Sequence, residues 1–275
     1  MMKSPRMRSI VARAAALGAA SLLLFACSAR GAEIRGAEIK VVSSGGLAAA
    51  LSELAPEFER STGSKLVLAR GPSMGNTPNA IPARLQRGEP IDVVVMVGHA
   101  LDGLVREGKV VADSKVDLAR SAIGMVVRKG APRPDIGSAE AVKRALLEAK
   151  SIAYSDSASG VYIATEMLPR LGIADQVKAK SRMIPARPVA EMVASGEAEV
   201  GFQQISELLP VPGVDLVGPL PPELQKITVF SAGVVAGSKA PDAARALVAF
   251  LASREAVPAI TRSGLDAIAG DEGRR

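Results

Sequence analysis

One local pattern most constrains the fold of this chain: a short apolar strand that runs into a serine- and glycine-rich turn before a helix. It is clearest in residues 151–162 (SIAYSDSASGVY), where a helical pattern begins at about Val161. The first backbone N–H groups of a helix lack internal partners and the helix dipole favours negative charge, so such a turn suits an anion. Serine and aspartate also cap helices without binding a ligand, so one such turn does not establish a site.

The rest of the chain repeats this alternation of strands and helices. Leu47, Leu51, Leu54 and Phe58 recur at helical spacing after a short strand, and Gly63 ends that helix. We expect strands at 38–43, 65–69, 91–97, 123–127, 151–154, 182–184, 199–203, 214–217 and 227–235, and helices at 47–62, 83–86, 101–105, 139–149, 162–171, 189–194, 242–251 and 255–263. The alternation predicts an α/β protein with mainly parallel sheets.

The order of these units predicts two lobes joined by two crossings of the chain. We expect residues 32–120 and 230–275 to form the first lobe and residues 121–229 the second, with crossings near Arg120 and Ile227. In open α/β sheets ligands bind beyond the carboxyl ends of the strands, so the predicted ligand cleft lies between the lobes.

Residues 1–31 have the character of an export signal and a tether. Lys3, Arg6, Arg8 and Arg13 precede an apolar stretch at 14–26 that is too short to span a membrane. Leu24-Phe25-Ala26-Cys27 resembles a bacterial lipobox, in which Cys27 would carry a lipid anchor, and the alternative is ordinary cleavage after Gly31. We therefore expect a periplasmic protein whose membrane attachment, if any, is through Cys27. This residue is the chain's sole cysteine, so no internal disulfide is expected.

The formal net charge of +6 is concentrated in the signal. Residues 1–31 carry five basic and no acidic side chains, so the remainder has a charge near +1. No basic block is left to neutralise a phosphate backbone, so nucleic acid is not an expected partner. The low aromatic content of 3% and the absence of tryptophan disfavour a stacking site for bases or sugars.

Small or amide hydrogen-bonding residues stand at the carboxyl ends of five expected strands. They are Ser43–Gly46, Ser73-Met74-Gly75, Gly98-His99, the turn at 155–160 with Asp156, Ser157, Ser159 and Gly160, and Gln203-Gln204. At the serine- and glycine-rich ends, backbone N–H groups can approach an oxyanion closely. Together the five ends predict a small anion held by neutral donors.

Charged and titratable residues near these ends have two interpretations. Arg70, Arg84, Arg182 and Arg187 flank the expected turns, and each is either a carboxylate clamp or a solvated surface residue. His99 is the chain's one histidine, and a lone histidine is more often a capping or packing residue than a catalytic one. No metal-ligand spacing, phosphate loop or serine–histidine–acid triad can be assigned, so neither a metal nor a cofactor is expected.

Four segments resemble the periplasmic molybdate-binding-protein-like family of solute-binding proteins. They are VVSSGGLAAALSELAPEFERSTG, LQRGEPIDVVVMV, SASGVYIATEMLPRLGI and ASGEAEVGFQQISEL, and the resemblance spans residues 38 to 265. It implies a type II periplasmic binding protein fold, in which two α/β lobes close on an anion, and an ABC permease as a partner. The implied ligand-binding set is Ser44, Gly45, Gly46, Arg70, Ser73, Met74, Gly75, His99, Ser157, Ser159, Gly160, Val161, Tyr162, Gln203 and Gln204.

Two departures from the family pattern indicate a ligand larger than molybdate. The segment GPSMGNTPNAIPARL is longer than the serine-rich turn of the molybdate binders, and Gln203-Gln204 replace a tyrosine. Our main interpretation is therefore a receptor for an organic di- or tricarboxylate. The alternative follows from a resemblance to a branch that interconverts cis- and trans-aconitate, which implies His99 or Asp156 as the base. A third interpretation is molybdate or tungstate binding.

Overall fold

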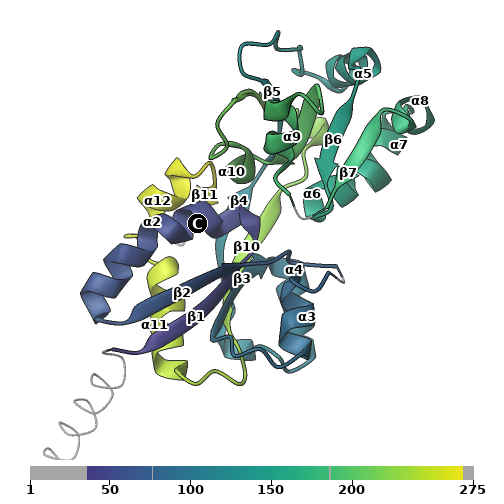
Figure 1. The fold of residues 1–275 in the computed structure, drawn as a ribbon. Helices are drawn as coiled ribbons and strands as arrows, with labels where there is room; N and C mark the ends of the chain where they lie inside the picture. Colours follow the sequence, from purple (N-terminus) through teal and green to yellow (C-terminus); the bar gives the residue numbers. More distant parts are fainter. Residues whose placement is uncertain (1–35, 76, 186, 269–275) are drawn as a thin grey trace, which may run out of the picture.

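Two β-sheets, each covered by helices, organise the computed structural model into two lobes (Figure 1). The structure describes residues 36–75, 77–185 and 187–268. The predicted signal, the lipobox at Cys27 and residues 269–275 lie outside the described residues. None of the helices within those three ranges has the length and apolar character needed to cross a bilayer.

The first lobe is built on a six-stranded sheet in the order β11-β4-β10-β3-β1-β2. Its strands are β1 (Glu38–Ser43), β2 (Lys65–Arg70), β3 (Val93–Val97), β4 (Val116–Ser121), β10 (Thr228–Val234) and β11 (Asp266–Ala267). Its helices are α2 (Gly45–Thr62), α3 (Ile81–Gln86), α4 (Gly98–Arg106), α11 (Pro241–Leu251) and α12 (Val257–Arg262), with a 3₁₀ turn at Ala112–Ser114.

The second lobe is built on a five-stranded sheet in the order β7-β6-β8-β5-β9. Its strands are β5 (Ile123–Arg128), β6 (Ile152–Ser155), β7 (Ser181–Ile184), β8 (Val200–Gln204) and β9 (Val214–Pro219). Its helices are α5 (Ala139–Glu148), α6 (Ala158–Tyr162), a π-helical turn at Ile163–Met167, α7 (Leu168–Arg170), α8 (Ala174–Lys178), α9 (Val189–Ser195) and α10 (Ile205–Leu208), with a 3₁₀ turn at Pro222–Leu224.

Both sheets are mixed, so the prediction of mainly parallel sheets is wrong. In the first sheet β1 pairs in parallel with β2 and β3, whereas β10 runs antiparallel between β3 and β4. In the second, β6 is parallel to β7 and β8, but β5 is antiparallel to β8 and β9. The antiparallel pairings involve the strands beside the crossings: β4 leads into β5, and β9 leads through the 3₁₀ turn into β10.

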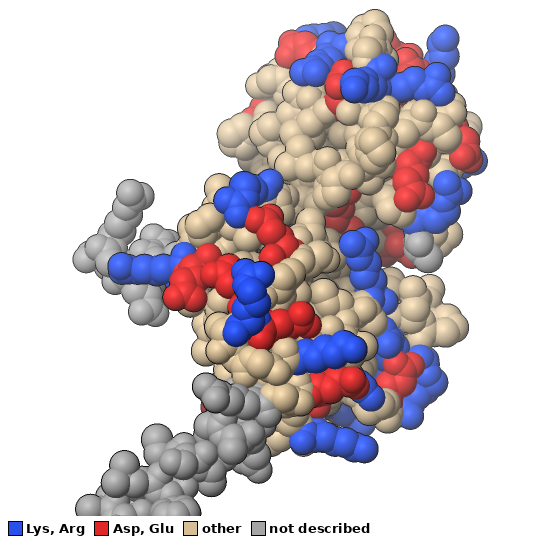
Figure 2. Space-filling model, turned by 60° about the vertical axis from the view of Figure 1, so that its left-hand side comes forward, with Lys and Arg blue, Asp and Glu red and all other residues tan. Residues whose placement is uncertain are grey.

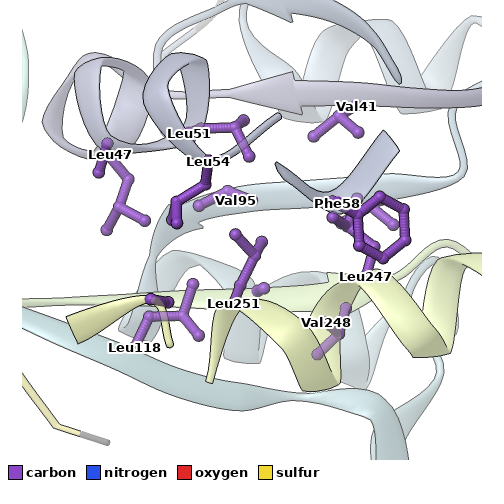
Figure 3. Packing of buried hydrophobic residues seen from close by; sticks show 14 of the residues in the cluster. Val41, Leu47, Leu51, Leu54, Phe58, Val95, Leu118, Leu247, Val248 and Leu251 are labelled. Atoms are coloured by element: carbon purple, nitrogen blue, oxygen red, sulfur yellow. The ribbon is translucent and has the colours of Figure 1, made fainter. Parts of the chain in front are cut away.

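The long helix α2 anchors the core of the first lobe (Figure 3). Its apolar face, with Leu51, Leu54 and Phe58, packs between the sheet and α11, where Leu247 and Leu251 are buried. Burial of each such side chain contributes about 1.5–3 kcal/mol. Gly63 ends α2 in the left-handed conformation, with φ of +71°, as predicted. This packing fixes the direction of α2 and therefore the place of its N-terminus.

Candidate functional site

A cavity of about 250 Å³ lies between the two lobes and is lined by residues of both. The first lobe contributes the turn after β1, the end of β2 with the loop that follows, and Phe230 of β10. The second lobe contributes the turn between β6 and α6, the segment before α9, and the end of β8 with α10. The cavity therefore lies at the carboxyl ends of strands from both sheets, where α/β proteins bind ligands.

The N-terminus of α2 presents free hydrogen-bond donors to this cavity. Ser44 is the N-cap residue, yet its side chain makes no capping bond, and its buried Oγ has no partner in the described chain. Gly45 and Gly46 begin the helix, where backbone N–H groups have no carbonyl of a preceding turn to bind. The end of the helix thus offers neutral donors and a favourable dipole to an anion.

The turn between β6 and α6 forms the facing wall. The Oγ of Ser155 lies 2.8 Å from the Oγ of Ser157 and 3.0 Å from that of Ser159. The N-cap is Ser157, so α6 begins at Ala158 rather than near Val161. A Cβ at Gly160 would overlap the carbonyl oxygen of Ser155, so glycine is required for this close turn. The hydroxyls of the turn are therefore fixed by one another beside the cavity.

Among the residues described, Glu207 is the one whose carboxyl pKa is strongly raised. Its side chain extends from α10, and its Oε2 accepts a 2.7 Å hydrogen bond from Nε2 of Gln203. Loss of water around the carboxyl raises the pKa of Glu207 to about 7; the Gln203 bond and the charge of Arg70 oppose the rise, and Asp156 adds to it. A carboxyl with this pKa can both accept and donate a proton near neutral pH.

The same carboxyl lies against the N-terminus of α2. A Cβ on Gly45 would overlap Oε2 of Glu207, so glycine at this position permits the approach. Glu207 belongs to the second lobe and Gly45 to the first, and both line the cavity. A titratable oxygen therefore lies next to the donors expected to hold an anion.

Two arginines line the cavity, one from each lobe. Arg70 ends β2 and forms no ion pair within the described ranges, and Arg187 precedes α9 and lies 3.8 Å from Glu191. Neither is tightly neutralised, so each is free to bind a carboxylate. Arg84 and Arg182 are engaged away from the cavity, with Glu89 and with the carbonyl of Glu197.

The structure brings together about half of the predicted site residues. Those that line the cavity are Ser44, Gly45, Arg70, Ser73, Asp156, Ser157, Gln203 and Gln204. Ser73 has a structural bond, because its Oγ accepts from the backbone N–H of Val97 at 3.0 Å. Gln204 donates to Oγ1 of Thr228 at 3.0 Å, whereas its buried Oε1 has no partner among the residues described.

The remaining predicted residues lie behind the cavity wall or elsewhere. Gly46, Ser159 and Gly160 are buried, and a Cβ on Gly46 would overlap the ring of Phe230. Gly75 is exposed on its loop. A separate groove of about 520 Å³ is lined by Met74, His99, Val161 and Tyr162. The predicted histidine base is therefore in a different depression from the arginines and Glu207.

Sequence reasoning missed Glu207, Asn79 and Phe230 as lining residues. No signal in the sequence marked Glu207, because Gln203 belongs to the strand β8 and Glu207 to α10, and a four-residue spacing predicts contact only within one helix. Phe230 was expected inside a strand and gave no sign of its position at the cavity. In the described parts of the chain, no three His, Cys, Asp or Glu side chains are grouped closely enough to hold a metal ion.

Comparison with known proteins gives consistent matches. Residues 39–266 match the family model described as bacterial extracellular solute-binding protein. A protein from Pseudomonas sp. named aconitate isomerase is 54% identical over 227 residues, which cover 82% of this chain and 87% of that protein. The molybdate-binding protein ModA of Azotobacter vinelandii is 28% identical over 197 residues, covering 70% and 71% of the two chains.

Solved structures of binding proteins share the fold. The periplasmic molybdate-binding protein of Azotobacter vinelandii superimposes with a TM-score of 0.66 at 21% identity, over 82% of this chain and 98% of that one. The sulfate-binding protein SubI of Mycobacterium tuberculosis gives a TM-score of 0.67 at 20% identity, over 85% and 88%. The two-lobed type II periplasmic binding protein fold is thereby confirmed, and the chain belongs to the bacterial extracellular solute-binding protein family.

Proposed function

We propose that this protein is an exported enzyme that interconverts cis- and trans-aconitate in its interlobe cavity. The observation that carries the proposal is Glu207, a carboxyl with a pKa near neutrality that lies against the N-terminus of α2, in a cavity that Arg70 and Arg187 also line. A receptor that only captures an anion does not require a further carboxyl in its cavity, since the ionised form repels an anion. A proton-transfer enzyme needs such a group.

The reaction is an allylic proton shift that Glu207 can perform alone. Its ionised carboxyl takes a proton from the methylene carbon next to a substrate carboxylate, so that a C–H bond breaks and an O–H bond forms. The electron pair spreads over the allylic carbons and their carboxylates, and the double bond shifts by one position. Glu207 then returns a proton to the former vinyl carbon. The new double bond forms in the cis or trans arrangement, and nothing is consumed.

The cavity offers partners for all three carboxylates of this substrate. The free donors at α2 with Ser44 suit one, and Arg70 and Arg187 suit the others. These groups stabilise the negative charge that spreads towards the carboxylates during proton transfer. The name of the 54% identical relative supports the same substrate.

The test compares aconitate turnover by the wild-type protein and by Glu207→Gln. Incubation with trans-aconitate, followed by chromatographic separation of the isomers, gives the rate of cis-aconitate formation. We expect the variant to lose about 10²–10⁴-fold in rate, the usual contribution of a general base. Glu148→Gln, an exposed residue at the end of α5, is the matched control. The variant Asp156→Asn tests Asp156, the base predicted from the sequence on the facing turn, separately from Glu207.

The second candidate is a carboxylate receptor for an ABC importer. Family membership favours it, because solute-binding proteins commonly serve transport. Calorimetric binding of aconitate without any turnover by the wild-type protein would support the receptor and reject the enzyme. Binding of molybdate, with no response to carboxylates, would instead support the third interpretation.

A further inference from the structure

We propose that Gln203 is a positioning residue that engages one oxygen of Glu207 and leaves the other, Oε1, as the oxygen that exchanges protons with the ligand. This inference rests on the proposed function for its consequence in catalysis. The interaction between the two side chains is a property of the ligand-free protein. It can therefore be tested even if the substrate is different.

The orientation of the Gln203 amide is determined by its two partners. Gln203 is 4% exposed at the end of β8, and its Oε1 accepts a 3.0 Å hydrogen bond from the backbone N–H of Val189. A backbone N–H can only donate, so the amide oxygen must face α9. The NH₂ group therefore faces Glu207, where Nε2 donates to Oε2 at 2.7 Å.

One side of the Glu207 carboxyl is consequently occupied. Oε2 accepts from Gln203 and lies against Gly45, where an added Cβ would overlap it. Oε1 has no hydrogen-bond partner in the described ranges, and Glu207 lines the cavity. A carboxylate held in this way has a single free oxygen for the proton, in a fixed direction.

The Gln203 bond also supports the ionised form that the reaction requires. A hydrogen bond donated to a carboxylate favours its charged state and lowers its pKa. Arg70, from β2, acts in the same direction, and Asp156, from the turn before α6, acts against it. Arg187 and Glu191 lie on the α9 side of the cavity, and the first turn of α2 contributes N–H groups but no charged side chain. Gln203 is therefore the uncharged group whose hydrogen bond partly offsets the rise in the pKa of Glu207 that burial causes.

The test begins with carbon-13 NMR titration of the glutamate side-chain carboxyls in the ligand-free protein. Absence of one signal in Glu207→Gln identifies the resonance of Glu207. In Gln203→Met the donor is lost without a change in charge, and we expect the pKa of Glu207 to rise by about one unit. Gln204→Met is the matched control, because that neighbouring amide donates to Thr228 instead. We expect no such shift there.

The pH profile of turnover gives a second readout that a merely structural role would not move. With a shift of about one unit, kcat/KM of Gln203→Met falls about tenfold more at pH 6 than at pH 9. Gln203→Glu keeps an acceptor for the Val189 N–H and so guards against local unfolding. It replaces the donor by a carboxylate, and we expect an even larger upward shift in the pKa of Glu207.

The outcomes separate this inference from the proposed function. An unchanged Glu207 titration in both Gln203 variants would overturn the inference even if the wild-type protein is an isomerase. An equal shift in Gln204→Met would overturn it too, because the effect would not be specific to the bond. A shift in the Gln203 variants alone supports the inference, whether or not aconitate is turned over.

Discussion

Glu207 differs from an ordinary surface glutamate because it is placed between groups of several elements. The first turn of α2, the end of β2 and the turn before α6 all face its carboxyl. Its pKa of about 7 results from burial, which raises it, with the Gln203 hydrogen bond and the charge of Arg70 opposing the rise and Asp156 adding to it. No single segment of sequence contains this information, so neither the hydrogen bond to Gln203 nor a titration near neutrality was predicted from the sequence.

The raised pKa of Glu207 makes the protein less stable as the pH rises. Its folded-state pKa of about 7 lies above the ordinary value of 4.5 for a glutamate carboxyl. Stabilisation by the bound proton is therefore complete below pH 4.5 and is lost as the pH rises through 7, by up to about 3 kcal/mol. In Glu207→Gln this titration is absent. We expect urea unfolding to show that the free energy of unfolding of the variant rises relative to that of the wild type between pH 5 and pH 8. A difference that stays constant over that range would contradict the shift.

The serine and glycine residues of the site were more predictable than its acid. Ser44, Gly45 and Ser157 come directly after strands, and strand ends meet at the cavity in this class of fold. His99 also follows a strand, β3, yet it lines another groove. Position after a strand thus identifies the edge of the sheet, whereas the direction of a side chain from that edge depends on the helix that follows.

At the scale of elements, periodicity revealed the long segments and missed the short ones. The sequence predicted α2 and α11 because each has several apolar residues on one face, and β3 because it is a continuous apolar run. It missed α8 and α10, which have five and four residues and too few turns for a period, and β4 (VDLARS), in which apolar residues neither alternate regularly nor form a run. The direction of strand pairing was not predictable either, because alternation of apolar residues does not depend on whether the neighbour is parallel.

The close turn between β6 and α6 is the element most sensitive to substitution. A Cβ on Gly160 would overlap backbone atoms of Ser155, which cannot move without displacing the strand. We expect Gly160→Ala to lower the free energy of unfolding by about 3 kcal/mol. Gly103→Ala in α4 is the control, because the nearest atom there is 3.9 Å from the added Cβ. Chemical denaturation measures the free energy of unfolding of both variants. Equal values would show that the turn relaxes around the added Cβ.

At the scale of the whole molecule, the cavity depends on the two lobes together. The chain passes from one sheet to the other between β4 and β5 and again between β9 and β10. On the face shown in Figure 2, acidic and basic side chains are interspersed over both lobes, without an extended patch of one sign. On this face, therefore, the charged side chains form no surface patch that would attract an anion.

One arginine from each lobe should contribute to ligand affinity. We expect Arg70→Met and Arg187→Met each to weaken aconitate binding about 10- to 100-fold, the value of a charge-assisted hydrogen bond of about 1.5–3 kcal/mol. Arg182→Met is the control, since Arg182 bonds to the carbonyl of Glu197 outside the cavity. Calorimetry checks all three variants. If Arg182→Met lost as much affinity as the other two, the ligand would bind elsewhere.

The central claim is that Glu207 moves an allylic proton within the interlobe cavity. The most direct measurement is NMR of trans-aconitate incubated in deuterated buffer with the wild-type protein and with Glu207→Gln. The wild-type protein is expected to form cis-aconitate, in which the returned hydrogen is protium where Glu207 transfers it directly and deuterium where its carboxyl first exchanges with solvent. The variant is expected to leave the trans isomer unlabelled and unconverted. Formation of cis-aconitate at an undiminished rate by the variant would contradict the claim.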